Sequence, residues 1–304
     1  MSLAAFQGSL ELGIIYAILA LGVFLSFRSL NMPDLTVDSS FTLGAAVSVI
    51  MSVSGHPFLG LLIAFIAGGG AGCITGLLHT KLEIQPLLAG ILTMLGLYSI
   101  NLKVMGGKAN IPLLNKPTVY SVFEKIVPGD YSRLIFAALI LIFILLLFYL
   151  FLKTRLGFAL RATGDNDQMV RSLGVNTDFI ILIGMALSNG LVALSGALIA
   201  QEQSFVDVGM GIGMVVIGLA SVIIGEVVFG TKTLFRRLIA VVLGSILYRL
   251  IIALALELGM PPTDLKLVSA VIVTIAMSMP IINKKIAFTR RKYRRNDSSR
   301  KSIS

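Results

Sequence analysis

Nine apolar segments set the architecture of this 304-residue chain. A helix needs roughly 20 apolar residues to cross the ~30 Å hydrocarbon core of a bilayer, and each segment is close to that length. Charged residues make up 13% of the chain, against about 25% in soluble domains. The sequence therefore predicts an all-α polytopic membrane protein with about nine transmembrane helices, or eight to ten, in a transmembrane domain over residues 1–282. The segments are 8–27, 37–54, 57–78, 86–105, 133–152, 179–200, 209–229, 238–256 and 265–282.

The Lys and Arg residues predict the orientation of the chain. They concentrate in the cytoplasmic segments of membrane proteins, and the tail at 283–304 holds nine of the 25 in this sequence. The polar segment 153–178 adds four more. We therefore expect a multi-pass protein with a basic cytoplasmic tail, a cytoplasmic C-terminus and an N-terminus outside. The net charge of +10 then reflects this topology and the anionic lipid of the inner leaflet, not nucleic-acid binding.

The sequence lacks the motifs of enzymes and metal sites. The stretch GEVVFGTKT (225–233) approaches the phosphate-binding pattern G-x-x-x-x-G-K-[ST], but Thr231 stands in the Lys position and the first Gly lies inside an apolar segment. The two histidines, His56 and His79, lie at opposite ends of one expected span, so they cannot share a metal ion. We expect no catalytic residue, no metal site and no cofactor bound by this chain.

The run GGGAGCITG places Gly68, Gly72 and Gly76 four residues apart on one helix face. Such a spacing lets a second backbone approach closely in lipid. It favours packing within the chain, with dimerisation as the alternative.

Two similar stretches point to a transport passage. VDSSFTLGAAVSVIM (37–51) and VDVGMGIGMVVIGLA (206–220) both have Val-Asp and then Gly six residues after the Asp, so Asp38 matches Asp207 and Gly44 matches Gly213. Because the expected topology brings the two copies into the membrane from opposite sides, they predict an inverted repeat with two broken or half helices. Broken helices at matching positions indicate a transporter's binding site, since their N-termini can present free amides to an anionic group.

Polar residues near these helix starts complete the candidate passage. Pro33 ends any helix from the first span, and the residues after it are of the types that cap helix N-termini. Simple capping at the membrane surface is the alternative role. Arg249 lies midway through an apolar segment, where a charge either pairs with a carboxylate or faces a water-filled cavity. The candidate substrate-pathway residues are Asp34, Thr36, Asp38, Ser39, Ser40, Gly44, Asn189, Asp207 and Gly213.

The polar segment 153–178 lies between two strongly apolar segments. Asp165 to Leu173 reads as a short helix, with Asp165 or Asn166 as its N-cap and Gly174 as its stop. Exposed apolar residues on a cytosolic helix indicate a docking surface. Three apolar residues are expected on one face of this helix: Met169, Val170 and Leu173.

The stretch LGFALRATGDNDQMVRSLGVN resembles the coupling loop of binding-protein-dependent ABC importer permeases of the branched-chain amino acid and ribose type. In that family the loop reads Gly-x-Ala-hydrophobic-Arg-Ala-x-Gly, then a short helix and Gly-hydrophobic-Asn, and it fits a groove of the cytosolic ATPase. This chain departs from the family where Ala-Ala is common inside the helix. The resemblance implies these ATPase-coupling residues: Gly157, Arg161, Ala162, Gly164, Asp165, Asn166, Met169, Val170, Arg171 and Gly174.

The resemblance covers nearly all of residues 8–282, and FRSLNMPDLTVDSSFTLGAA and VGMGIGMVVIGLASVIIGE are most similar to a Gram-positive subgroup linked to uptake of aromatic amino acids such as tryptophan or tyrosine. It implies a permease subunit in the bacterial cell membrane that is not itself an enzyme. ATP and Mg would be bound by two separate ATPase subunits. A second, identical permease chain and an extracellular solute-binding lipoprotein would complete the importer.

Other functions stay open on the sequence. A stand-alone secondary transporter or channel would also use inverted repeats, but such a transporter usually commits a titratable residue in mid-membrane to ion coupling and needs no docking helix. An ABC permease for a nucleoside or a sugar would share the same plan.

Overall fold

The structure, a computed structural model, describes residues 3–129, 131–261, 264, 267–275 and 278. Seven helices of these residues are long and apolar enough to cross a membrane, which confirms seven of the nine expected spans. They are α1 (Leu3–Val23, continued by the π-helix η1, Phe24–Ser29), α2 (Thr36–Val53), α3 (Pro57–Thr80), α4 (Pro86–Val104), α6 (Ser132–Lys153), α9 (Thr177–Gln203) and α11 (Leu234–Glu257).

The two remaining expected spans differ from this pattern. The segment 209–229 begins with turns over 209–213, and only α10 (Met214–Phe229) is helical, so it is a half helix of 16 residues. The segment 265–282 lies largely outside the described residues, although 267–275 is helical.

The first of the two expected broken helices, near Asp38, is not broken: the irregular backbone lies before α2 and not within it. α2 is continuous over its 18 residues, and the irregular stretch 30–35 separates it from η1. Asn31 has a positive φ of 56° in this stretch, and Pro33 cannot donate the backbone hydrogen bond that a helix would need there. The half-helix prediction therefore fits α10 but not α2.

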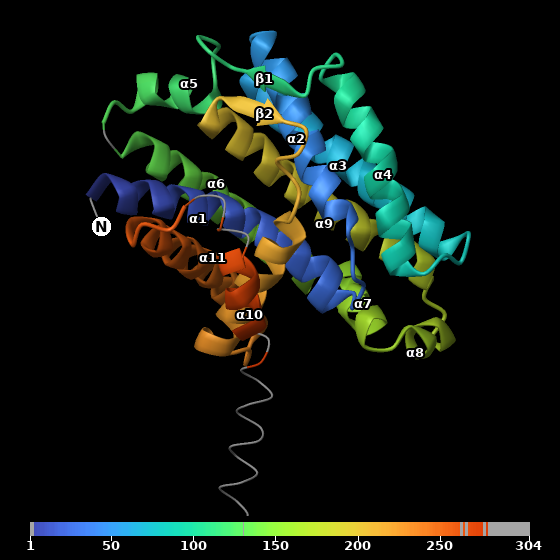
Figure 1. Cartoon of the computed structure of the whole chain (residues 1–304). Helices are drawn as coiled ribbons and strands as arrows, with labels where there is room; N and C mark the ends of the chain where they lie inside the picture. Colours follow the sequence, from blue (N-terminus) through green and yellow to red (C-terminus); the bar gives the residue numbers. More distant parts are fainter. Residues whose placement is uncertain (1–2, 130, 262–263, 265–266, 276–277, 279–304) are drawn as a thin grey trace, which may run out of the picture.

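Five short elements lie between the long helices. The strands β1 and β2 pair antiparallel, with Ile111 opposite Val206. They lie with α5 at one end of the molecule, which we call the sheet end, and α7 and α8 lie at the opposite end (Figure 1). The short elements are β1 (Asn110–Pro112), α5 (Val119–Ile126), α7 (Arg155–Asp165), α8 (Asp167–Ser172) and β2 (Phe205–Asp207).

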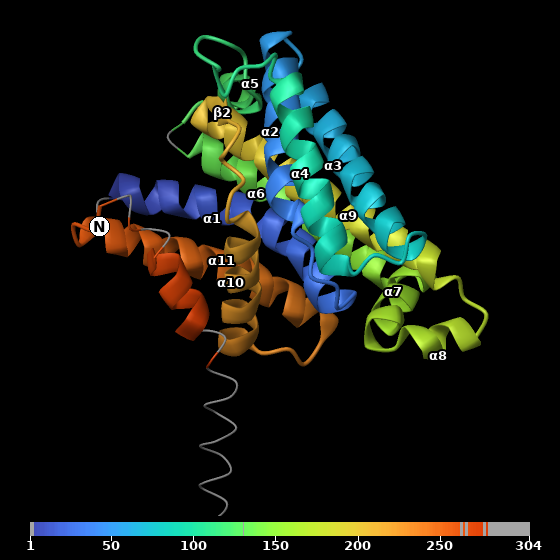
Figure 2. The same ribbon diagram turned by 45° about the vertical axis from the view of Figure 1, so that its right-hand side comes forward.

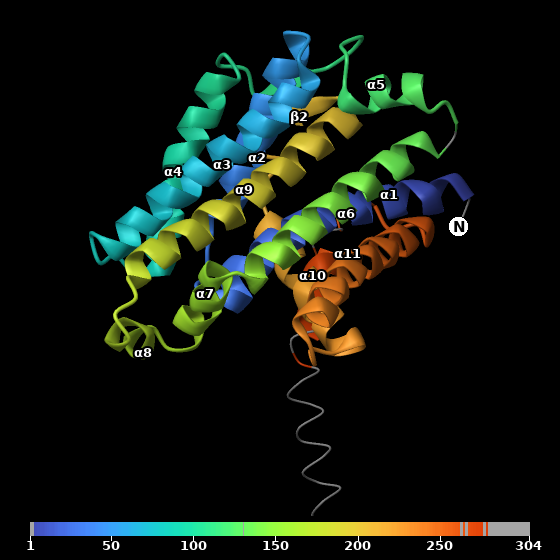
Figure 3. The ribbon, with the colours of Figure 1, turned by 180° about the vertical axis from the view of Figure 1, so that it is seen from behind.

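The long helices form two groups. α2, α3, α4 and α9 pack together, while α1 packs with α6, α10 and α11. Figures 1 and 3 show the two groups from opposite sides, and Figure 2 shows α1 and α11 next to α10. The groups are joined where α1 packs against α9.

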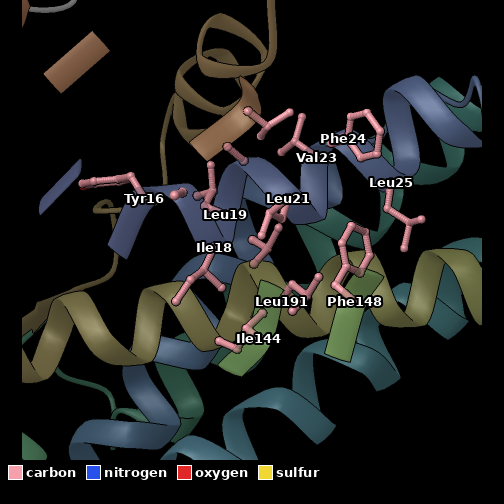
Figure 4. Close-up of a cluster of buried hydrophobic side chains, with 14 of the residues drawn as sticks. Tyr16, Ile18, Leu19, Leu21, Val23, Phe24, Leu25, Ile144, Phe148 and Leu191 are labelled. Atoms are coloured by element: carbon pink, nitrogen blue, oxygen red, sulfur yellow. The ribbon is translucent and has the colours of Figure 1, made fainter. Parts of the chain in front are cut away.

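A hydrophobic core fills this junction. Figure 4 shows apolar side chains of α1, including Ile18 and Leu21, next to Leu191 of α9 and to Ile144 and Phe148 of α6, and all five residues belong to one buried cluster. α1, α2 and α9 are the most deeply buried of the seven long helices, whereas fewer than half of the residues in the apolar stretches of α3, α4, α6 and α11 are buried. Between Arg133 and Lys153 near its two ends, the exposed side chains of α6 are leucines, isoleucines and a phenylalanine, as lipid contact requires.

Glycines bring α3 against α9. A Cβ atom on Gly72 would overlap the carbonyl oxygen of Met185, and one on Gly68 would overlap the side chain of Ala193. Gly76 lies over Leu182 on the same helix. These contacts confirm that the Gly-rich run serves packing within the chain.

Candidate functional site

The helix α7 is seated on the transmembrane helices by residues that the family resemblance singled out. A Cβ atom on Gly157 would overlap the backbone of Leu152 at the end of α6, and one on Gly164 would overlap the carbonyl oxygen of Ser29 in η1. The Arg161 Nη2 donates a hydrogen bond of 3.3 Å to the carbonyl oxygen of Leu152. These residues therefore hold α7 in place.

The helix α8 has an N-cap and a terminal glycine that the sequence predicts. Asn166, rather than Asp165, is its N-cap, because the Asn166 side chain accepts a 3.0 Å hydrogen bond from the Met169 amide. Gly174 follows the helix with a φ of 81°, a left-handed conformation that glycine adopts without strain. The helix spans only Asp167–Ser172, which is shorter than expected.

The exposed face of α8 differs from the prediction at one residue. Met169 and Leu173 are exposed, but Val170 is 3% exposed and points inward. The three apolar residues therefore do not share one exposed face. Phe158 of α7 is also exposed. We call Phe158, Met169 and Leu173 the docking surface.

The remaining coupling candidates lie around this surface. Asp165 is exposed at the end of α7, and Ala162 is half-buried in the same helix. Arg171 donates a 2.8 Å hydrogen bond to the Thr177 hydroxyl and forms a 2.9 Å ion pair with Asp178. It therefore ties α8 to the start of α9.

A buried polar network fixes the start of α2. The Asp34 Oδ1 accepts a 2.9 Å hydrogen bond from the Thr36 amide, and its Oδ2 accepts a 2.7 Å hydrogen bond from the Asn189 side chain. Burial raises the pKa of the Asp34 carboxyl, and the hydrogen bonds from Thr36 and Asn189 oppose that rise. The Thr36 and Thr75 hydroxyls lie 2.7 Å apart. Asp34, Thr36 and Asn189 therefore hold α2 to α3 and α9.

Three further pathway candidates lie in helix contacts. The Ser39 hydroxyl donates a 2.9 Å hydrogen bond to the carbonyl oxygen of Met94 in α4. The Ser40 hydroxyl is buried and has no hydrogen-bond partner among the described residues. A Cβ atom on Gly44 would overlap the carbonyl oxygen of Ala193, so Gly44 lets α2 approach α9 and does not meet α10.

Asp38 caps the half helix α10. Its two carboxylate oxygens accept 2.9 Å hydrogen bonds from the amides of Gly213 and Val215. These groups belong to the unpaired amides of a helix N-terminus, where a negative charge is favoured. The expectation that this terminus presents free amides to a substrate is therefore wrong for the Gly213 and Val215 amides, because a carboxylate of the protein already binds them.

The two halves of the proposed repeat have different local structures. Asp38 lies in the first turn of α2, whereas Asp207 ends strand β2 and accepts a 2.8 Å hydrogen bond from the Gly209 amide. Gly213 has a φ of 92° and no close neighbour for a Cβ atom. The tight backbone contact is made instead by Gly211, where a Cβ atom would overlap the Asp38 carbonyl oxygen.

A cavity of about 460 Å³ opens where α1, α10 and α11 meet, and Gly213 lines it. The Cζ of Arg249 lies 4.0 Å from the ring centroid of Tyr16. Among the described residues no ion pair includes Arg249, which lines the cavity, although its charge interacts at longer range with the Glu202 carboxylate. The other lining residues are Tyr16, Gly209, Met210, Ile212, Met214, Val216, Ile217, Tyr248, Ile252, Ser269 and Ala270.

The far end of α10 is held by charges. The Glu226 carboxylate forms ion pairs of 2.8 Å with Arg28 of η1 and 3.4 Å with Arg237 of α11. Sequence reasoning missed this cluster because Arg28 and Glu226 are 198 residues apart. It also did not connect Arg249 with Tyr16, although an Arg inside an apolar span was a sufficient signal to search for a cavity.

Comparisons with known proteins identify the family. A family model described as a branched-chain amino acid transport system permease component matches residues 6–278. A tyrosine transport system permease protein from Clostridioides difficile (strain R20291) is 41% identical over 280 residues, which cover 92% of each chain. An uncharacterized protein from Rickettsia prowazekii (strain Madrid E) is 35% identical over 274 residues, 89% of this chain and 95% of the relative. The autoinducer 2 import system permease protein LsrC from Yersinia enterocolitica is 30% identical over 258 residues, 81% of this chain and 67% of the relative.

No solved structure matches the chain. The family model and these relatives nevertheless extend over most of its length, including the segment of α7 and α8 and the half helix α10. The chain belongs to the family of branched-chain amino acid transport system permease components, and it is a permease subunit of an ABC importer.

Proposed function

We propose that this permease imports an amino acid with an aromatic side chain, delivered by an extracellular binding protein and driven by ATP. The observation that carries the substrate class is the 41% identity to a tyrosine transport permease over 92% of both chains. The cavity next to α10 agrees with it, because tyrosine rings and apolar side chains make most of its wall. The autoinducer 2 permeases are less similar, at 30% identity, and a sugar or nucleoside is the second candidate.

We propose that the end of the molecule with α7 and α8 lies in the cytoplasm and that the sheet end lies outside the cell. The polar segment 153–178 and the basic tail 283–304 carry an excess of Lys and Arg, as cytoplasmic segments do. To test this, single cysteines replace Ser172 near the α7–α8 end and Asn115 near the sheet end, in a chain with Cys73→Ser. In intact cells a membrane-impermeant thiol reagent should label the position-115 variant only, and the reverse pattern would contradict the proposed orientation.

We propose the ATPase subunits as partners because of the exposed docking surface. Phe158, Met169 and Leu173 are exposed on a charged segment, and exposed apolar side chains of this kind indicate a protein interface. We assign this surface to the ATPase, so that each of two identical permease chains binds one of two ATPase subunits. ATP and Mg then bind the ATPases and not this chain.

The substrate is tested by uptake into proteoliposomes that contain the permease, its ATPase and its binding protein. Labelled tyrosine, leucine and ribose are compared with and without ATP. We expect ATP-dependent uptake of tyrosine above that of leucine, and no uptake of ribose. ATP-independent uptake would favour a secondary transporter or channel, and uptake of ribose alone would assign the permease to sugars.

A further inference from the structure

One charged side chain of the candidate passage has no carboxylate partner within the described residues. Arg249 lies eight residues before the end of α11 at Glu257, which is roughly 12 Å along a helix. A charged side chain is costly at such a depth and usually marks a partner or a solute pathway. We propose that Arg249 binds the carboxylate of the amino acid as it passes through the cavity, an inference that rests on the proposed function.

The side chain of Arg249 is held in place, and among the described residues it forms no direct ion pair; the Glu202 carboxylate interacts with it only at longer range. The Arg249 Cβ lies 3.6 Å from the point that a Cβ atom on Gly13 would occupy, so the base of the Arg249 side chain packs against α1. The guanidinium lies over the Tyr16 ring at 4.0 Å, and this cation–π contact covers one face of the group. The Nε is buried and donates no hydrogen bond. Because Arg249 lines the cavity and its Nη groups are not among the buried unpartnered atoms, these two groups are the donors that a ligand can reach.

The cavity supplies the rest of an amino-acid site. Its volume of about 460 Å³ is within the range of roughly 300–1,000 Å³ that small-molecule sites have. A guanidinium binds a carboxylate through two parallel hydrogen bonds, which a neutral sugar cannot use in the same way. Ile212, Val216 and Ile252 give an apolar wall for a side chain. No Asp or Glu is among the described residues that line it, so the wall offers no partner for a cationic side chain.

The Tyr248 hydroxyl is already engaged, because it lies 2.7 Å from the Ser269 hydroxyl. Its ring therefore contributes apolar surface, and Arg249 is the group in the described wall that selects for charge. The chemical class expected is a zwitterionic α-amino acid with an apolar or aromatic side chain.

The first test compares transport by variants of the reconstituted importer. Arg249→Met should lower uptake of the amino acid by about 10- to 100-fold, the effect of losing hydrogen bonds between charged groups. Arg249→Lys keeps the charge but loses the two-pronged geometry, so its uptake should be intermediate. Arg133→Met, which removes an exposed arginine paired with Glu124, is the matched control and should transport normally. All variants should still assemble with the ATPase.

The second test examines the wild-type importer, so it does not depend on the variants folding. Phenylglyoxal modifies arginines, and mass spectrometry measures the rate at Arg249 and at the exposed Arg155. Tyrosine should slow modification at Arg249 several-fold, tyrosinamide should not, and Arg155 should react equally in all samples.

Two results overturn the assignment. The first is full uptake of the amino acid by Arg249→Met. The second is equal protection of Arg249 from phenylglyoxal by tyrosine and by tyrosinamide, in an importer that transports tyrosine. A wild-type importer that moves only uncharged solutes overturns the proposed substrate as well, so the two failures are distinguishable.

Discussion

The cap that Asp38 provides to α10 can be tested by removing it. Asp38→Ala leaves the amides of Gly213 and Val215 without their acceptor, since both now bond to the carboxylate at 2.9 Å. A hydrogen bond to a charged group contributes about 1.5–3 kcal/mol. Because Asp38 is only half-buried and the cavity borders Gly213, water can bond to the freed amides and restore part of the lost stability. We therefore expect α10 to lose about 2–3 kcal/mol of local stability, or about 30- to 150-fold in its opening equilibrium.

Hydrogen exchange followed by mass spectrometry measures this equilibrium at the start of α10. The amides of Gly213 and Val215 should exchange faster by the factor given above, while those in the middle of α3 should not change. Asp207→Ala is the matched control, because the Asp207 carboxylate accepts its hydrogen bond from the Gly209 amide, outside α10, and not from the amides of Gly213 and Val215. Unchanged exchange in Asp38→Ala, or an equal increase in Asp207→Ala, would refute the capping role.

Three further variants test other parts of the structure. Gly44→Leu should prevent folding, seen as loss of the monodisperse protein, because any side chain at this position meets the backbone of α9. Gly213→Leu should still fold, with about 1–2 kcal/mol of strain from its positive φ. Equal yields of the two variants would contradict this difference. Leu173→Glu should abolish capture of the ATPase in pull-downs, whereas Ser172→Glu, its neighbour, should retain it. Glu226→Gln should weaken the ion pairs to two arginines and lower the melting temperature, an effect that high salt should reduce; a salt-independent loss would argue against electrostatics.

Local features of the chain could be predicted from the sequence. The apolar segments predict the long helices because the bilayer fixes both their length and their composition. Asn166 and Gly174 predict the bounds of α8 because caps act on neighbouring residues. The glycines of α3 predict a close helix contact, because a spacing of four residues places them on one face of the helix.

Long-range contacts could not be predicted in this way. Asp38 and Gly213 are 175 residues apart, and nothing in either stretch indicates that one caps the other. The matching Val-Asp pairs instead suggested equivalent helix starts, but Asp207 lies in a strand because β1 pairs with it there. Val170 likewise points inward because α8 packs on its neighbours, which its own sequence does not reveal.

The π-helix η1 has a mechanical consequence. On one side it meets α7 through bare backbone, since Gly164 lies against the Ser29 carbonyl group, and on the other side Arg28 is bonded to Glu226 near the end of α10. Close-packed interiors compress little, and no flexible side chain at Gly164 can absorb a displacement. An ångström-scale displacement of α7 is therefore passed to η1 by direct backbone contact, whereas the links onward from η1 to α10 and from α8 to α9 pass through the long side chains of Arg28 and Arg171.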